Sequence, residues 1–94
     1  MNKIEQKILE LNDPEESYFY CLANDSCNLK AHEKIIIESK DPEECYFFAK
    51  DIYGANKQLL SEIVLASGNL HLIKLFYNNI NFDKSRYEKL MLFI

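Results

Sequence analysis

The stretch Lys40–Ser67, KDPEECYFFAKDIYGANKQLLSEIVLAS, decides the fold because the chain carries it almost twice. Shifted back by 28 residues, it aligns without a gap on residues 12–39. Nine positions are then identical: Asp13/Asp41, Pro14/Pro42, Glu15/Glu43, Glu16/Glu44, Tyr18/Tyr46, Phe19/Phe47, Asn28/Asn56, Ile35/Ile63 and Ser39/Ser67. Shifted forward by 28 residues, it aligns more loosely on residues 68–94, which keep the apolar pattern. A repeat of this length indicates stacked units that bury their apolar faces against one another.

Helix-start signals open the first two copies. Asp13 and Asp41 are suited to cap a helix, and the proline after each suits the first helical position. Glu16 and Glu44 lie three residues after these caps, where they are predicted to complete capping boxes. Together with the apolar periodicity, such signals predict helices over residues 2–11, 14–24, 29–39, 42–52, 57–67, 70–79 and 84–93.

The predicted architecture is all-α: an αα-hairpin repeat solenoid of about seven short helices in a single domain, residues 1–94. Its units are a capping half-repeat (1–11), two good copies (12–39 and 40–67) and a degenerate third copy (68–94). Two columns of equivalent side chains are expected to stack through the core: Phe19, Phe47 and Leu75, and then Tyr20, Phe48 and Phe76.

The composition favours a folded helical protein and limits its partners. Hydrophobic residues make up 48% of the chain, and two glycines and two prolines are too few for a turn-rich β protein. The net charge of −4 divides unevenly, with −6 on residues 1–51 and +2 on residues 52–94. General binding to nucleic acid, which needs clustered Lys and Arg, is therefore not expected. The sequence shows neither a signal-peptide pattern nor a membrane-spanning apolar run, so a cytoplasmic protein is expected.

The three cysteines, Cys21, Cys27 and Cys45, are odd in number and irregular in spacing. This pattern indicates reduced thiols in a cytosolic setting, and burial of neutral thiols is the favoured interpretation. The pairs of closely spaced ligands that mark a zinc site are missing from the sequence. A metal or redox role for these cysteines remains a third hypothesis.

The two histidines show no catalytic pattern either. His32 falls in a core-facing column with Ile4 and Leu60, and His71 matches glutamates in the first turn of a helix. A nucleophile, a base and an orienting group must be held together for covalent catalysis, and no motif directs a serine or cysteine toward either histidine. The chain is therefore expected to be non-enzymatic, without catalytic residues, cofactor or metal.

The unit D-P-E-x-x-Y-x-F-A-x-D-x-x-G-A-N-x-x-x-L, read from Asp41 to Leu60, resembles a short helical repeat of uncharacterised bacterial and phage proteins. The first copy keeps Tyr18 and Asn28 of this unit but departs from it in the turn, residues 24–27. The resemblance implies an α-solenoid and no defined activity. A small chain rich in Lys, Asn and Ile also resembles accessory proteins of phages and mobile elements, among them inhibitors of bacterial defence systems such as CRISPR effectors.

Stacked helical repeats present an extended surface whose usual role is binding. We therefore expect a protein-binding module, in the manner of a phage inhibitor, that presents its acidic half to a basic nucleic-acid-handling protein. The expected contact residues are five carboxylates and two tyrosines: Glu15, Glu16, Glu43, Glu44, Asp51, Tyr46 and Tyr53. The alternative for each carboxylate is a helix cap or a solvated face.

The C-terminal segment is apolar, with the sequence Leu90-Met91-Leu92-Phe93-Ile94. A terminal repeat usually has a polar outer side, so this segment is expected to form a contact surface. Leu90, Met91, Phe93 and Ile94 are the residues expected in self-association. A homodimeric structural scaffold is therefore the alternative function.

Overall fold

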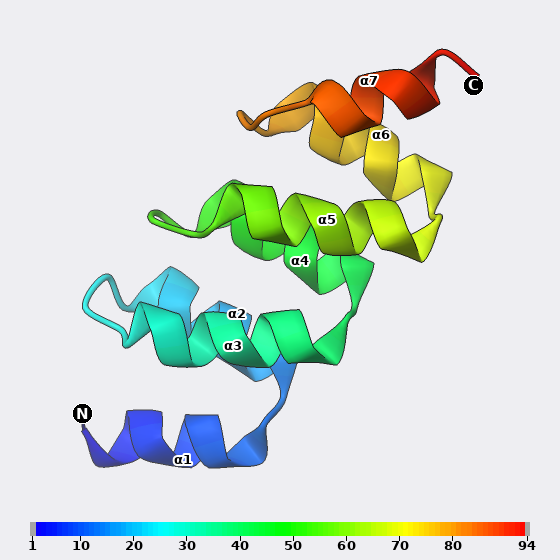
Figure 1. The fold of residues 1–94 in the computed structure, drawn as a ribbon. Helices are drawn as coiled ribbons and strands as arrows, with labels where there is room; N and C mark the ends of the chain where they lie inside the picture. Colours follow the sequence, from blue (N-terminus) through cyan, green and yellow to red (C-terminus); the bar gives the residue numbers. More distant parts are fainter. Residues whose placement is uncertain (1, 94) are drawn as a thin grey trace.

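The computed structural model describes residues 2–93, which form seven helices and no strand (Figure 1). The helices are α1 (Lys3–Leu11), α2 (Pro14–Ala23), α3 (Leu29–Ser39), α4 (Pro42–Asp51), α5 (Lys57–Ser67), α6 (Leu70–Asn79) and α7 (Ser85–Met91). The predicted all-α class is confirmed. None of these helices is long and apolar enough to cross a membrane.

Three predicted helices, 29–39, 57–67 and 70–79, have the bounds that the sequence indicated. The other four are shorter: 2–11 begins at Lys3, 14–24 ends at Ala23, 42–52 ends at Asp51, and 84–93 is reduced to Ser85–Met91. α2 and α4 end early because Asn24 and Ile52 adopt extended backbone angles.

The helices alternate between two layers. Figure 1 shows α3, α5 and α7 in front of α2, α4 and α6. α2 packs against α3 and α4 against α5 as hairpins, while α2, α4 and α6 contact one another in sequence along the rear layer. The resulting stack is elongated, with extents of 48 × 20 × 15 Å. First turns of α2 and α4, which carry the repeated glutamates, are thereby placed beside each other.

Helix ends repeat with the same 28-residue interval. The predicted caps are found at Asp13 and Asp41, whose side chains accept hydrogen bonds from backbone N–H groups of the first turn. Left-handed backbone ends α1, α3 and α5 at Asn12, Lys40 and Gly68, with φ of 52°, 54° and 72°. Asn and Gly suit this conformation, whereas lysine adopts it at a cost.

A glutamate-to-backbone hydrogen bond joins successive units in the front layer. The Asn28 N–H donates to Glu5 Oε2 over 2.7 Å, and the Asn56 N–H donates to Glu33 Oε2 over 2.7 Å. Donor and acceptor are 23 residues apart in both cases, and the two bonds are related by the repeat. The glutamate of one unit therefore satisfies a free N–H at the start of the next front-layer helix.

The third joint is built differently. Ser61 occupies the position of Glu5 and Glu33, and its carbonyl accepts a hydrogen bond of 2.5 Å from the Tyr87 hydroxyl. Gln58 then replaces the glutamate contact, because its side chain both donates to the Asp83 carbonyl and accepts from the Asp83 N–H. The drift seen in the sequence of the third copy thus corresponds to a different set of contacts.

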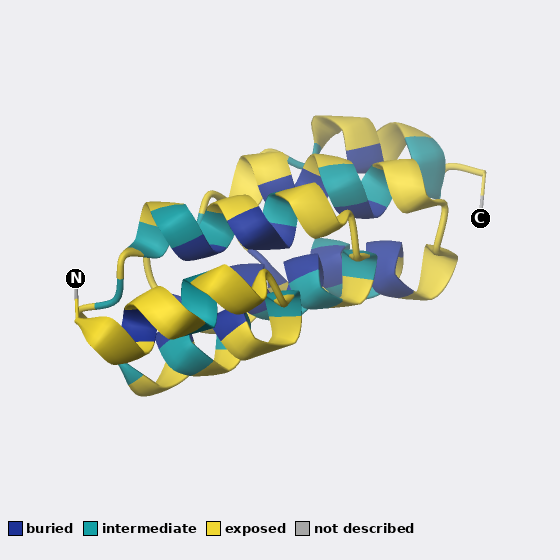
Figure 2. Cartoon of the chain, turned by 90° about the horizontal axis from the view of Figure 1, so that it is seen from below, coloured by how far each residue is buried: buried dark blue, intermediate teal, exposed yellow. Residues whose placement is uncertain are grey.

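The core lies between the two layers, where Figure 2 shows the buried residues gathered. Phe48 and Phe76 are fully buried, as the column that contains them predicted, whereas Tyr20 of the same column is only partly buried. The other predicted core column is wrong at Phe19, which is 51% exposed, whereas Phe47 and Leu75 are partly buried and pack against the core. The rings of Phe19 and Phe47, at equivalent positions of α2 and α4, therefore lie at the edge of the stack, where they line a pocket.

The His32 column is only partly as predicted. His32 and Leu60 are fully buried, but Ile4 is 69% exposed. Its neighbour Glu5 turns inward instead and is 4% exposed. The Glu5 carboxylate is stable in this buried place because it accepts hydrogen bonds there.

Candidate functional site

Three of the expected carboxylates meet in one pocket between α2 and α4. The pocket has a volume of about 310 Å³, and we call it the acidic pocket. Three glutamates and three aromatic side chains line it: Glu15, Tyr18, Phe19, Glu43, Glu44 and Phe47. Because the glutamates come from equivalent first turns of neighbouring helices, the pocket is a direct product of the repeated Asp-Pro-Glu-Glu segment.

Glu44 departs from its predicted capping role. The backbone N–H of Asp41, which a capping box would pair with Glu44, donates instead to Ser39 Oγ over 3.2 Å. Among the described residues, Glu44 Oε2 is the buried side-chain oxygen that has no hydrogen-bond partner. The predicted capping box at Glu44 is therefore wrong, and the carboxylate is left facing its neighbours.

The carboxylates around Glu44 repel its negative charge. Burial, followed by the charges of Asp41 and Glu15 and then of Glu43 and Asp13, raises the pKa of Glu44 above its ordinary value of 4.5. A bound cation would reduce the repulsion between these carboxylates. The acidic pocket therefore has both an unfilled acceptor and a local excess of negative charge.

The aromatic walls of the acidic pocket come from α2 and α4. The ring of Tyr18 lies with its centroid 5.3 Å from that of Phe19 and 6.2 Å from that of Phe47. Lys50 Nζ already lies 5.9 Å from the centroid of Phe47, a distance compatible with a cation–π contact. Flat apolar faces beside carboxylates suit a planar or alkyl-stemmed cation.

Asp51 lies outside the acidic pocket and is used within the fold. Its carboxylate accepts a hydrogen bond from the Tyr18 hydroxyl and lies 2.9 Å from Lys50 Nζ. Burial opposes ionisation, but these two contacts outweigh it and lower the pKa of Asp51 below 3.8. Burial and the bond to Asp51 also raise the pKa of Tyr18 to about 12. This pair ties α2 to α4.

The two predicted tyrosine anchors have opposite environments. Tyr46 is 5% exposed, and its hydroxyl accepts a hydrogen bond of 3.0 Å from Asn79 Nδ2. This contact is the repeat equivalent of the Tyr18–Asp51 bond, so Tyr46 belongs to the core. Tyr53 is fully exposed in the α4–α5 loop, at the end of α4 that is remote from the acidic pocket. Glu16 is exposed but does not line the pocket.

A buried polar network was not anticipated from the sequence. His32 Nε2 lies 2.9 Å from Glu5 Oε2, and His32 Nδ1 lies 3.0 Å from Ser17 Oγ. Tyr20 stacks on the imidazole with a centroid distance of 5.2 Å. The order serine–histidine–carboxylate is that of a catalytic triad, but Ser17 and His32 have no exposed surface, and a substrate does not reach Ser17 Oγ in this conformation.

The C-terminal apolar residues are unequally placed. Leu90 and Met91 are partly buried, whereas Leu92 and Phe93 are 83% and 86% exposed. Ile94 lies outside the described residues. Leu90 and Phe93 line a shallow pocket of about 580 Å³ with Leu65, Gly68, Leu70, Ile73, Arg86 and Lys89.

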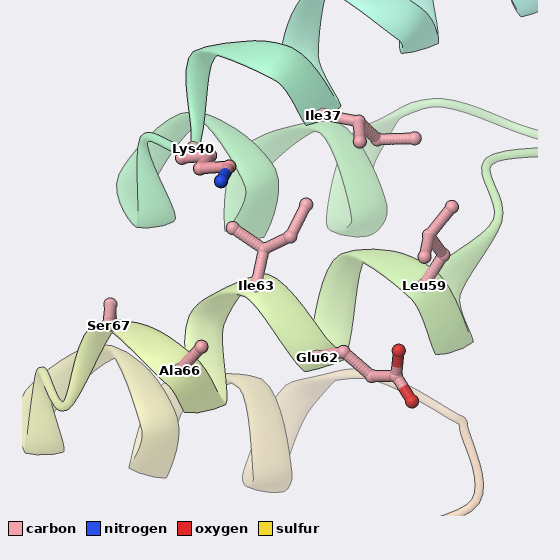
Figure 3. A pocket seen from close by; sticks show the side chains of 7 residues that line it. All are labelled: Ile37, Lys40, Leu59, Glu62, Ile63, Ala66 and Ser67. Carbon is pink, nitrogen blue, oxygen red and sulfur yellow. The ribbon is translucent and has the colours of Figure 1, made fainter.

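A further groove lies between α3 and α5 and has a volume of about 340 Å³. In Figure 3 the side chains of Ile37, Leu59 and Ile63 converge on it. Lys40 and Glu62 stand at its margins, and Glu62 forms an ion pair of 3.2 Å with Arg86. This groove is mainly apolar and has no excess of one charge.

Within residues 2–93, no three His, Cys, Asp or Glu side chains are grouped so that they could hold a metal ion. Comparisons with protein-family models, with curated proteins and with solved structures find no match for this chain. Function is therefore inferred from the residues and their geometry.

Proposed function

We propose that this chain is a non-enzymatic protein-binding module that takes an Arg or Lys side chain of a basic partner into the acidic pocket. One observation carries the proposal: three glutamates and three aromatic rings line a single pocket, and one glutamate oxygen there is buried without a partner. Buried acceptors are normally satisfied, so this oxygen marks a place for a donor.

Arginine suits the pocket better than lysine. Its planar guanidinium offers several N–H donors, which can be shared between Glu44 and the glutamates on either side of the pocket. The same plane can stack on Phe47 while the alkyl stem lies along Phe19. Entry of the cation also relieves the repulsion that raises the pKa of Glu44.

The class of partner follows from charge and from the resemblance of the repeat. The half of the chain that contains the acidic pocket carries a net charge of −6. A basic groove on a nucleic-acid-handling protein complements it, and electrostatic attraction of this kind accelerates association and selects partners. We place inhibition of a bacterial defence protein, such as a CRISPR effector, within this proposal as the role that the phage-type resemblance suggests.

The proposal is tested with fluorescein-labelled peptides in which arginine or lysine alternates with serine. The double variant Glu43→Gln/Glu44→Gln is compared with Glu10→Gln/Glu38→Gln, which removes two exposed carboxylates elsewhere. The pocket variant is expected to weaken binding of the arginine peptide about tenfold, and the control variant less than about twofold. Equal losses in the two variants would show binding to net charge alone and refute the pocket.

Self-association is a second candidate function, favoured by the exposure of Leu92 and Phe93. Large exposed apolar side chains mark contact surfaces. Phe93→Ser is expected to shift a concentration-dependent dimer to monomer in sedimentation velocity without loss of helix content. A wild-type chain that stays monomeric at the highest soluble concentration would exclude this function.

A further inference from the structure

Two of the three cysteines lie side by side at the end of the first hairpin. Cys21 is in the last turns of α2, and Cys27 is in the loop that leads to α3. Their Sγ atoms are 2.9 Å apart. The loop holds Cys27 in place through a hydrogen bond of 3.1 Å from its backbone N–H to the Asn24 carbonyl. The thiols therefore meet within the folded chain without any movement of the helices.

The repeat shows that packing does not require sulfur at these positions. The equivalents of Cys21 and Cys27 in the next unit are Ala49 and Ala55. Ala49 belongs to the buried core, and Ala55 packs against it. A small side chain is thus enough to fill each position, yet the first unit has a thiol at both. Cys45, by contrast, is fully buried, and its thiol donates a hydrogen bond of 3.8 Å to the Ile36 carbonyl.

A solvent-accessible pocket of about 350 Å³ leads to the thiol pair. Both cysteines line it, together with Asn24, Asp25, Leu29, Ile52 and Tyr53. Cys21 is 5% exposed, whereas Cys27 is only partly buried. A small thiol reagent therefore reaches Cys27 first.

We propose that Cys21 and Cys27 form a reversible intramolecular disulfide and that a low-molecular-weight disulfide such as glutathione disulfide is the oxidant. The Cys27 thiolate attacks one glutathione sulfur, which breaks the glutathione S–S bond and releases one glutathione. Cys21 then loses its proton to solvent and attacks Cys27 Sγ, which releases the second glutathione. The protein loses two electrons and two protons, and glutathione disulfide gains both to become two glutathione thiols.

The environments of the two thiols fit this order of attack. Burial, followed by hydrogen bonding and charge interaction with Cys27, raises the pKa of Cys21 above its ordinary value of 9.0. Cys21 is therefore the poorer first nucleophile, and its role is to resolve the mixed disulfide on Cys27. In this second step the short distance between the two sulfurs, 2.9 Å, compensates for the low thiolate fraction of Cys21.

The bond would also strengthen the attachment of α1. Asn28 follows Cys27 directly, and its N–H donates to Glu5 Oε2 over 2.7 Å. Fixing the loop to α2 holds this donor in place. Oxidised protein is therefore expected to show slower amide exchange in α1 than reduced protein, whereas exchange in α6 is unchanged.

The test measures thiol–disulfide equilibrium in glutathione buffers, with the folded protein compared with the protein in urea. After acid quenching and alkylation, trypsin separates residues 8–30, which contain both thiols, from residues 41–50, which contain Cys45. The equilibrium constant for the 21–27 disulfide is expected to be at least about tenfold larger in the folded chain than in the unfolded one. An equal or smaller constant in the folded chain would overturn the proposal.

Single variants check the order of the steps. Cys21→Ala is expected to accumulate a glutathione adduct on Cys27, because the resolving thiol is missing. Cys27→Ala is expected to leave Cys21 unmodified, and Cys45→Ala to behave as wild type. Adduct formation on Cys21 that is as fast as on Cys27 would contradict the proposed order. The wild-type equilibrium needs no variant and decides the disulfide by itself.

Discussion

Glu5 and His32 form a buried contact of 2.9 Å between α1 and α3. Glu5 is the one fully buried side chain of α1, while the apolar Ile4 and Leu11 of the same helix are 69% and 62% exposed. Hydrogen bonds to Glu5 therefore help to hold the first helix of the stack, beside the two apolar residues of that helix that are partly buried.

Replacement of Glu5 is expected to loosen α1. Glu5→Ala leaves the buried His32 and the Asn28 N–H without their acceptor, which should lower the free energy of unfolding by about 2–4 kcal/mol. Urea denaturation measures this loss. Glu10→Ala, an exposed substitution on the same helix, should change stability by less than about 0.5 kcal/mol. Equal effects of the two substitutions would show that the buried contact contributes nothing.

Acid is expected to weaken the fold through Glu5 and Asp51. Burial raises the pKa of Glu5, but hydrogen bonds from Asn28 and His32 outweigh it and bring the pKa below 4.5. The pKa of Asp51 is likewise below 3.8. Carboxylates with lowered pKa stabilise the fold above their unfolded values, and this stability is lost as the pH falls through the lower folded values. The midpoint of thermal unfolding should therefore fall as the pH is lowered below about 4.5. It should fall less steeply in Glu5→Ala than in the wild type.

Glu44→Gln is expected to separate stability from binding. Because the pKa of Glu44 is raised, its ionised form costs stability at neutral pH, and this cost is lost as the pH falls through the raised pKa toward 4.5. The variant should be more stable at neutral pH by about 0.5 kcal/mol, since solvent screens the partly exposed group. The same variant should bind the arginine peptide more weakly. A variant that loses stability would contradict the repulsion described for the acidic pocket.

Lys40→Gly is expected to stabilise the chain. Lys40 has a φ of 54° at the end of α3, where a side chain with a Cβ is disfavoured. Glycine removes this strain but adds freedom to the unfolded chain, so the net gain should be about 0.5–1 kcal/mol. The repeat supplies the control: Gly68→Lys, at the equivalent position with φ of 72°, should cost a similar amount. Chemical denaturation of both variants measures the two changes in the free energy of unfolding.

Local signals predicted the helices well because they act within a few residues. Asp13 and Asp41 start helices where the sequence indicated, and Gly68 ends one. The failures came from competition between neighbours. Ser39 takes the backbone N–H that was assigned to Glu44, and extended backbone at Ile52 ends α4.

The candidate site was predictable only in part. The Asp-Pro-Glu-Glu repeat indicated that Glu15, Glu43 and Glu44 would share a surface, and the structure places them in one pocket. Two of its three aromatic walls, Phe19 and Phe47, were assigned to the core, because periodicity does not distinguish an inner column from one at the edge of a layer. The Glu5–His32 contact joins residues 27 apart with no common motif, so only the packing of α1 against α3 reveals it.

The glutamate bonds at the first two joints make those joints interchangeable. A duplicate of residues 12–39 inserted after Ser39 would present an acceptor and an N–H in the same register as the originals, Glu33 and Asn56. A duplicate inserted after Ser67 would meet Ser61 where the acceptor belongs. The chain thus has one place where evolution or an engineer can lengthen it by copying, and one place where copying breaks the pattern.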